Sequence, residues 1–208
     1  MNHLFYKLAK LFCFLVLKIY NRLTVIWKKS LISTSPVIVA ANHCSNLDPV
    51  IIGAVFPRRL RYLAKSELFT IPGLSLLIRI LGAIPVVKQN SQSAGAALKA
   101  FLELLEQGEN VLLFPEGARS RDGGLQPLEG GVALIAMKSG APIIPAYIQG
   151  SFQSMPPGAR FVRPTRIKVT FGPAIVPSER TIGLSSKEGR LKLLEDVEEA
   201  LKKLEETN

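Results

Sequence analysis

The sequence predicts an α/β fold with a mostly parallel central sheet flanked by helices. Short apolar, β-branched runs alternate with stretches of helical periodicity, which is typical of strands joined by crossover helices. Several runs, among them VIVAA, VLLF and PIIPAYI, lack the polar alternation of a strand with one wet face. The length of 208 residues suits one well-buried domain.

The elements follow from these patterns in chain order. Strands are expected at 37–41, 61–64, 83–87, 110–114, 142–148 and 166–171, and helices near 49–56, 73–80, 91–107 and 130–139. A last helix begins after a capping box, in which Ser185 and Glu188 satisfy each other's backbone N–H groups. Its apolar residues recur every three or four positions up to Leu204, so we expect this helix to pack on the domain.

The chain is strongly basic, and the charge is unevenly placed. Lys and Arg number 26 against 16 acids, a net charge of +10 that favours a polyanionic partner: nucleic acid, an anionic membrane or a phosphate-bearing substrate. Residues 1–30 hold six cations and no acid, and they are also the most apolar part of the chain. This combination favours a membrane surface over nucleic acid. Cys13 and Cys44 form no CxxC pair, which predicts no disulfide framework and favours the cytoplasmic side of a membrane.

The N-terminal segment 1–32 is interpreted as a membrane anchor, and 33–208 as the α/β domain. Lys10 and Lys18 interrupt the apolar run, which is too short to span a bilayer, and no signal-peptide cleavage site follows. On a helical wheel the six cations fall within roughly 120°, opposite an aromatic face that includes Trp27. This pattern favours a helix lying in the interface of an anionic membrane. The alternatives are an amphipathic helix packed on its own domain and a helical hairpin broken near Asn21.

A first candidate loop, NHCSNLDP, follows the run VIVAA. His43 and Asp48 meet if the intervening residues form a turn, with Asp48 as the N-cap and Pro49 as the first residue of the next helix. A histidine oriented by a carboxylate is the minimal general base, and loops at the carboxyl ends of parallel strands are the usual ligand sites. In the alternative, Asp48 is only a cap and His43 a loop residue.

A second candidate loop, FPEGARSRDGG, follows the run VLLF. Arg119 and Arg121 offer bidentate contacts to phosphate oxygens, and the glycines allow backbone N–H groups to approach an anion. The alternative is a solvated turn. The loop has neither a P-loop nor a dinucleotide-binding pattern, which argues against nucleotide hydrolysis and NAD chemistry.

Together the two loops resemble the 1-acylglycerol-3-phosphate acyltransferase family of phospholipid synthesis. Its signature is an Asn-His-x4-Asp box, a Gly-to-Arg block, a Phe-Pro-Glu-Gly-Thr-Arg-Ser box and a proline-containing strand. Here GAIPVVK (82–88) is similar to the second block and APIIP (141–145) to the fourth. Two residues depart from the pattern: Lys88 replaces an Arg, which costs the bidentate fork, and Ala118 replaces a Thr.

The resemblance implies transfer of an acyl chain from acyl-CoA or acyl-carrier protein to the sn-2 hydroxyl of a lysophosphatidate, giving phosphatidic acid. His43 would act as general base and Asp48 would orient it, with no metal and no cofactor besides the acyl donor. The residues that would bind the acceptor phosphate and glycerol are Lys88, Glu116, Gly117, Arg119, Ser120 and Arg121. A Cys44–His43 nucleophilic dyad is disfavoured, because adjacent side chains in an extended loop point apart.

Other functions remain open. The chain has two histidines, His3 and His43, and His3 lies in the N-terminal segment, so a metal site with two or more imidazoles is not expected. A non-catalytic membrane-surface protein, a thioesterase using the same base with water, and an acyltransferase for another lysophospholipid or lipid acceptor are the alternatives.

Overall fold

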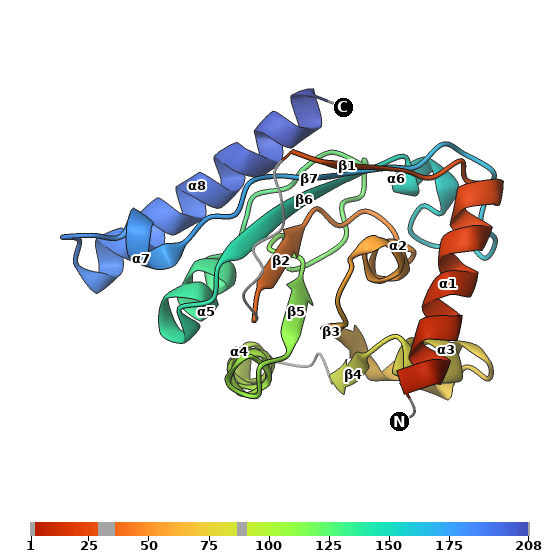
Figure 1. Ribbon diagram of the computed structural model, residues 1–208, viewed down its shortest axis with the longest axis horizontal. Coiled ribbons are helices and arrows are strands. Elements are labelled where there is room, and N and C mark those ends of the chain that lie inside the picture. The colour runs from red at the N-terminus through yellow and green to blue at the C-terminus, as the bar shows by residue number, and fades with distance from the viewer. Residues whose placement is uncertain (1–2, 29–35, 87–90, 208) are drawn as a thin grey trace.

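The computed structural model describes residues 3–28, 36–86 and 91–207, and it contains one seven-stranded sheet (Figure 1). The strand order is β1-β7-β6-β2-β5-β3-β4, and every neighbouring pair is parallel except β6 and β7. The strands are β1 (Thr24–Trp27), β2 (Ile38–Ala41), β3 (Leu60–Lys65), β4 (Ala83–Val86), β5 (Asn110–Leu113), β6 (Ile143–Gln149) and β7 (Lys168–Phe171). The predicted α/β fold with a mostly parallel sheet is therefore confirmed.

Helices cover both faces of this sheet, which explains the uninterrupted apolar strands. One face packs against α1 (His3–Tyr20), α2 (Asp48–Val55) and α3 (Leu74–Ile80), through residues such as Val39 and Ile144. The other face packs against α4 (Ser91–Glu106), α5 (Gly131–Ser139) and α8 (Ser186–Glu206), through Ile38 and Val111. The central strand β2 is buried on both faces.

The six strands and five helices expected in the α/β region are present within one to three residues of their predicted bounds at most ends. The capping box also forms: Glu188 N donates to Ser185 Oγ, and Ser185 N donates to Glu188 Oε2. Three helical elements were not predicted, because they are too short to show a helical periodicity in the sequence. They are η1 (Ser66–Thr70), α6 (Ser151–Ser154) and α7 (Pro177–Arg180).

The expectation of one continuous helix over residues 1–30 is wrong beyond Tyr20. The chain does break at Asn21, as the hairpin alternative required, but β1 follows instead of a second helix. β1 pairs in parallel with β7, and the Trp27 ring stacks on Phe171 with ring centroids 3.9 Å apart. The sheet therefore takes in residues that the division at 32 had assigned to the anchor.

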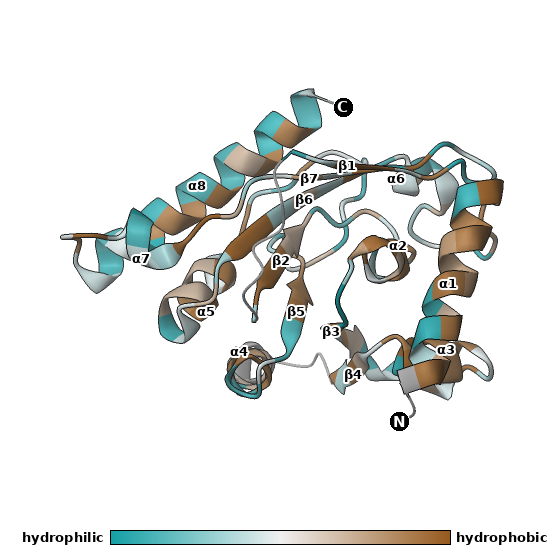
Figure 2. Ribbon diagram, viewed as in Figure 1, coloured by the Kyte–Doolittle hydropathy of each residue, from teal (hydrophilic) through white to brown (hydrophobic). Residues whose placement is uncertain are grey.

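Helix α1 packs on the domain with one face and exposes an apolar face on the other side. Tyr6, Cys13 and Leu17 are buried against the sheet-facing helices. Figure 2 shows that α1, at one end of the molecule, is mostly hydrophobic, whereas α8 is mainly hydrophilic. The exposed apolar face of α1 consists of Leu4, Phe5, Leu8, Leu11, Phe12, Leu15, Val16 and Ile19. Within the described ranges, no helix has the length and hydropathy needed to cross a membrane.

Candidate active site

Both candidate loops lie at the carboxyl ends of adjacent central strands. β2 pairs in parallel with β5, so the loop that follows Ala41 and the loop that follows Leu113 start side by side. Asn42 holds the first loop against β6, because its side-chain amide donates to the carbonyl of Ile148 and accepts from the Ile148 N–H. The strand order thus brings together two segments that are about seventy residues apart in the chain.

His43 and Asp48 form the predicted pair. His43 Nδ1 lies 2.9 Å from Asp48 Oδ2, and the Asp48 side chain is fully buried. The same carboxylate oxygen accepts the backbone N–H groups of Cys44 and Ser45, each at 2.7 Å. Because a carboxylate only accepts, Nδ1 carries the ring proton, and Nε2 is left as the basic nitrogen.

The start of α2 differs by one residue from the prediction. Leu47 is the N-cap and Asp48 is the first helical residue, with Pro49 in the first turn. The Asp48 side chain makes no capping bond to its own helix, since it turns back to the preceding loop. Ser45 Oγ accepts from the Leu47 N–H at 3.1 Å, and the Asp48 N–H donates to the Ser45 carbonyl at 3.3 Å, so Ser45 and Asp48 close the turn together. The Asp48 carboxylate therefore bonds to His43 and to the backbone of the preceding loop, and not to the N-terminus of its own helix.

Glu116 fastens the two loops together. Its Oε1 accepts the backbone N–H of His43 at 2.6 Å, and its Oε2 accepts that of Gln126 at 2.9 Å. The backbone N–H of Ser120 in turn donates to the His43 carbonyl at 2.7 Å. Burial raises the pKa of Glu116 from 4.5 to about 7, although both backbone N–H groups favour its ionised form.

The basic histidine lies at a cavity of about 740 Å³ between the loops and helices α4 and α5. The His43 ring stacks on Phe114, with ring centroids 4.0 Å apart and planes 18° apart. Arg119 and Arg121 also line the cavity. Nη1 of Arg119 is buried and has no hydrogen-bond partner among the described residues, so it is available to an anionic ligand.

The cavity contains further groups that the sequence analysis did not single out. Lys65 lines it from the end of β3, and Glu129 lines it from the segment before α5. Gly117 has a φ of +67°, a left-handed conformation that favours glycine, and the end of the Glu129 side chain occupies the space where a Cβ would lie. The only feature of the sequence that could have placed Lys65 in this cavity is its position at the carboxyl end of a predicted strand.

Only some of the residues predicted to bind the phosphate and glycerol line this cavity. Gly117, Arg119 and Arg121 line the cavity with His43, whereas Glu116 and Ser120 do not. Ser120 is buried, and its hydroxyl bonds within its own loop to Asp122, Gly123 and Gln126. The predicted phosphate ligand Lys88 lies outside the described residues.

The surroundings of Cys44 do not suit a nucleophile. Its Sγ lies 3.2 Å from the Ser151 hydroxyl, and burial raises the pKa of the thiol to about 12. A thiol in this state is protonated at neutral pH and is a poor nucleophile. The described part of the chain has no group of three His, Cys, Asp or Glu side chains arranged for a metal ion.

A model of the acyltransferase family matches residues 22–149, which include both loops. The chain belongs to the acyltransferase family. A crystal structure of the 1-acyl-sn-glycerophosphate acyltransferase from Thermotoga maritima is similar, with a TM-score of 0.73 and 28% identity, over 95% of this chain and 77% of that one.

Relatives in sequence carry the same type of name. A chloroplastic 1-acyl-sn-glycerol-3-phosphate acyltransferase from Brassica napus is 32% identical over 127 residues, covering 61% of this chain and 37% of that protein. The enzyme of that name from Bacillus subtilis is 28% identical over 189 residues, covering 90% of this chain and 87% of that protein. The chain spans little more than a third of the two plant relatives that match first.

Removing the Asp48 side chain will destabilise the protein. Asp48→Ala leaves the buried N–H groups of Cys44 and Ser45 without their acceptor, and we expect a loss of about 3 kcal/mol in the free energy of unfolding. Asp48→Asn retains an accepting oxygen and loses far less. Urea unfolding measures both, with Glu198→Ala, which removes the exposed ion pair with Lys202 on α8, as the control. Equal stability of Asp48→Ala and wild type would contradict the prediction.

Glu116 makes stability depend on pH. Its pKa is raised in the folded state, so the folded protein binds a proton more tightly than the unfolded chain between pH 4.5 and about 7. Its contribution to the free energy of unfolding is therefore fully present below pH 4.5 and is lost as the pH rises through about 7. We expect Glu116→Gln to remove this part of the pH dependence, which unfolding curves at pH 5 and pH 8 will show. The same slope in both proteins would be the contrary result.

Proposed function

We propose that the chain transfers an acyl group from an acyl thioester to the sn-2 hydroxyl of 1-acylglycerol 3-phosphate, giving phosphatidic acid. The observation that carries this proposal is the content of one cavity. It contains a carboxylate-oriented His43, an apolar interior, and Arg119, whose Nη1 has no hydrogen-bond partner in the described part of the chain. These features suit a hydroxyl, a phosphate and an acyl chain. The names of the relatives from Bacillus subtilis and Thermotoga maritima support the same substrate class.

His43 supplies the base. The Nδ1–H group of His43 stays hydrogen-bonded to Asp48. Its Nε2 takes the proton of the acceptor hydroxyl as the hydroxyl oxygen attacks the thioester carbonyl. The carbonyl carbon forms a C–O bond and loses its C–S bond, and the leaving thiolate takes up the proton from His43. Asp48 stabilises the imidazolium between these two steps. The acyl group passes directly to the acceptor, in line with the unreactive Cys44 thiol.

The polar end of the cavity suits the acceptor phosphate. Arg119 and Arg121 lie on the loop after β5, and Lys65 lies at the end of β3, so three cations from two strands line one space with His43. A guanidinium binds two phosphate oxygens at once, whereas an ammonium acts as a point charge. Arg119 is therefore the principal phosphate ligand in this proposal.

The apolar part of the cavity suits an acyl chain. Leu98 and Phe101 line it from α4, and Val132 and Ile135 line it from α5. These side chains belong to the apolar core between the sheet and the helices, so the depth of the cavity is set by core packing. The acyl donor is a thioester of coenzyme A or acyl-carrier protein, and its acyl chain would occupy this region.

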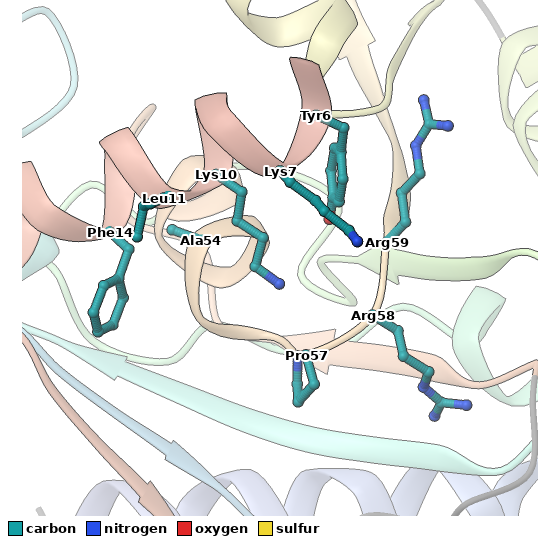
Figure 3. A pocket seen from close by; sticks show the side chains of 9 residues that line it. All are labelled: Tyr6, Lys7, Lys10, Leu11, Phe14, Ala54, Pro57, Arg58 and Arg59. Atoms are coloured by element: carbon teal, nitrogen blue, oxygen red, sulfur yellow. The ribbon is translucent and has the colours of Figure 1, made fainter. Parts of the chain in front are cut away.

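We also propose that the exposed apolar face of α1 rests on an anionic membrane, which holds both lipid substrates. A contiguous apolar face of this size indicates a binding surface, and basic flanks favour an anionic one. Figure 3 shows Lys7 and Lys10 extending from α1 toward the loop before β3, where Arg58 and Arg59 stand. These four cations line a hollow of about 460 Å³ between α1 and this loop, where the Lys10 ammonium also donates to the Phe56 carbonyl. Their charge suits lipid phosphates.

His43→Ala will abolish acyl transfer without unfolding the protein. The ring is partly exposed and its loss leaves Asp48 bonded to two backbone N–H groups. Purified protein, 1-acylglycerol 3-phosphate and acyl-CoA are assayed by thiol release and by product analysis. We expect turnover to fall by at least about a hundredfold, since a general base contributes 10²–10⁴-fold. Near wild-type turnover in His43→Ala would refute the mechanism, and thiol release that does not require the acceptor would indicate a thioesterase.

Arg119 will affect acceptor binding more than the chemical step. For Arg119→Gln we expect the KM for the lysophosphatidate to rise by about tenfold or more, because a charge-assisted bidentate contact is worth roughly 1.5–3 kcal/mol. The KM for the acyl thioester should change little. Arg180→Gln, which removes a surface cation on α7, is the matched control. A rise in the donor KM alone would assign Arg119 to the thioester instead.

A further inference from the structure

We propose that the loop between α6 and β7, residues 155–166, is a second membrane-contacting element, which inserts Phe161 into an anionic phospholipid surface beside α1. The inference rests on the membrane docking proposed for α1 and adds a separate surface to it. Figure 1 shows this loop beside the C-terminal end of α1.

The loop is fastened to the end of α1 by a buried amide. Asn21 Nδ2 donates to Ser154 Oγ at 3.0 Å and to the carbonyls of Arg163 and Thr165 at 2.9 and 3.2 Å. The Asn21 carbonyl accepts the N–H of Ile167 at 3.0 Å. These bonds connect both ends of the loop to the residue that follows α1, so the loop and the helix move as one body.

The tip of the loop combines an exposed aromatic ring with cations. The Phe161 side chain is 82% exposed, although its backbone lies next to the bond between the Tyr20 hydroxyl and the Val162 carbonyl, 3.2 Å long. Arg160 and Arg163 on either side of it are also exposed. An exposed large aromatic ring is costly in water, and one flanked by arginines suits the boundary between acyl chains and anionic headgroups.

Charge along the sequence favours an anionic lipid surface as the occupant. Residues 130–178 contain no Asp or Glu, so this loop has no acid of its own. Arg166 near the end of the loop, and Lys18 and Arg22 at the end of α1, add exposed cations to the same region. The apolar face of α1 ends at Ile19, one residue before the tyrosine that contacts the loop, so the apolar surface is continuous.

The loop also reaches the catalytic cavity. Pro157 lines that cavity together with His43, and the carbonyl of Met155 accepts the Ser45 hydroxyl at 2.7 Å. A bilayer in contact with Phe161 therefore lies next to the entrance used by the lipid substrate. The loop would shorten the path of a lysophosphatidate from the membrane to the base.

A tryptophan at the tip reports insertion directly. The chain has one tryptophan, Trp27, which is stacked inside the domain, so Trp27→Phe provides a background without it. In this background, Phe161→Trp should shift its emission to shorter wavelength on phosphatidylglycerol-containing vesicles and be quenched by brominated lipid. Ile182→Trp is the matched control, because Ile182 is 79% exposed in the turn between α7 and α8, at the opposite end of the molecule. Quenching of Ile182→Trp alone, or of neither tryptophan while the protein binds vesicles, overturns the proposal.

Two assays separate this inference from the proposed function. Phe161→Ser should weaken binding to anionic vesicles by about tenfold, as expected for the loss of one partly inserted aromatic ring, and Ile182→Ser should leave binding unchanged. Turnover of Phe161→Ser on vesicle-embedded 1-acylglycerol 3-phosphate should fall, and turnover on a short-chain, water-soluble acceptor should not. Wild-type vesicle turnover in Phe161→Ser overturns the loop proposal alone. Absence of turnover on both acceptors in the wild type overturns the proposed function, and absence of vesicle binding in the wild type overturns both membrane proposals.

Discussion

The buried carboxylate of Asp48 is the constraint on which the site depends. One of its oxygens accepts three hydrogens, from His43 Nδ1 and from the backbone N–H groups of Cys44 and Ser45. A buried carboxylate needs such partners, because burial without them costs several kcal/mol. The same bonds hold the loop after β2 in a tight turn just before α2, and they set the tautomer of the His43 imidazole. The local folding of the loop and the orientation of the His43 ring are thus two results of a single set of contacts.

The neighbouring loop completes this arrangement from the backbone side. Glu116 accepts the N–H of His43, while Ser120 donates its own N–H to the carbonyl of His43. Both peptide groups of His43 are therefore held by the loop that follows the neighbouring strand β5. The loop FPEGARS contains two kinds of residue. Glu116 and Ser120 bond to the backbone and side chains of the loops, whereas Arg119 lines the cavity that also contains His43. In our proposal only the second kind contacts the substrate.

The fold was predictable where burial determines the pattern. Strands such as β2 and β5 are covered on both faces, so their sequences are uniformly apolar and easily recognised. β1 was missed because Thr24–Trp27 continues the helical phase of the basic segment, and only pairing with β7 makes it a strand. The residues of the first loop allowed a pair of His43 and Asp48 but left a simple cap as the alternative, and the resemblance to the acyltransferase family favoured the pair. The hydrogen bond between Glu116 and the backbone N–H of His43 was not predicted, because every residue except proline has a backbone N–H and the sequence does not mark which one is bound.

The N-terminal helix shows how one segment satisfies two environments. Tyr6, Cys13 and Leu17 face the domain, whereas Phe12 and its neighbours face outward. A helix packed only on its own domain would have a polar outer face, and a free interfacial helix would bury nothing in the protein. Here the inner face ties α1 to α2, whose first residue is Asp48. The apolar face that we propose to contact the membrane therefore lies on a helix that packs directly against the helix carrying Asp48, so the two proposed roles, lipid binding and catalysis, are built on neighbouring elements.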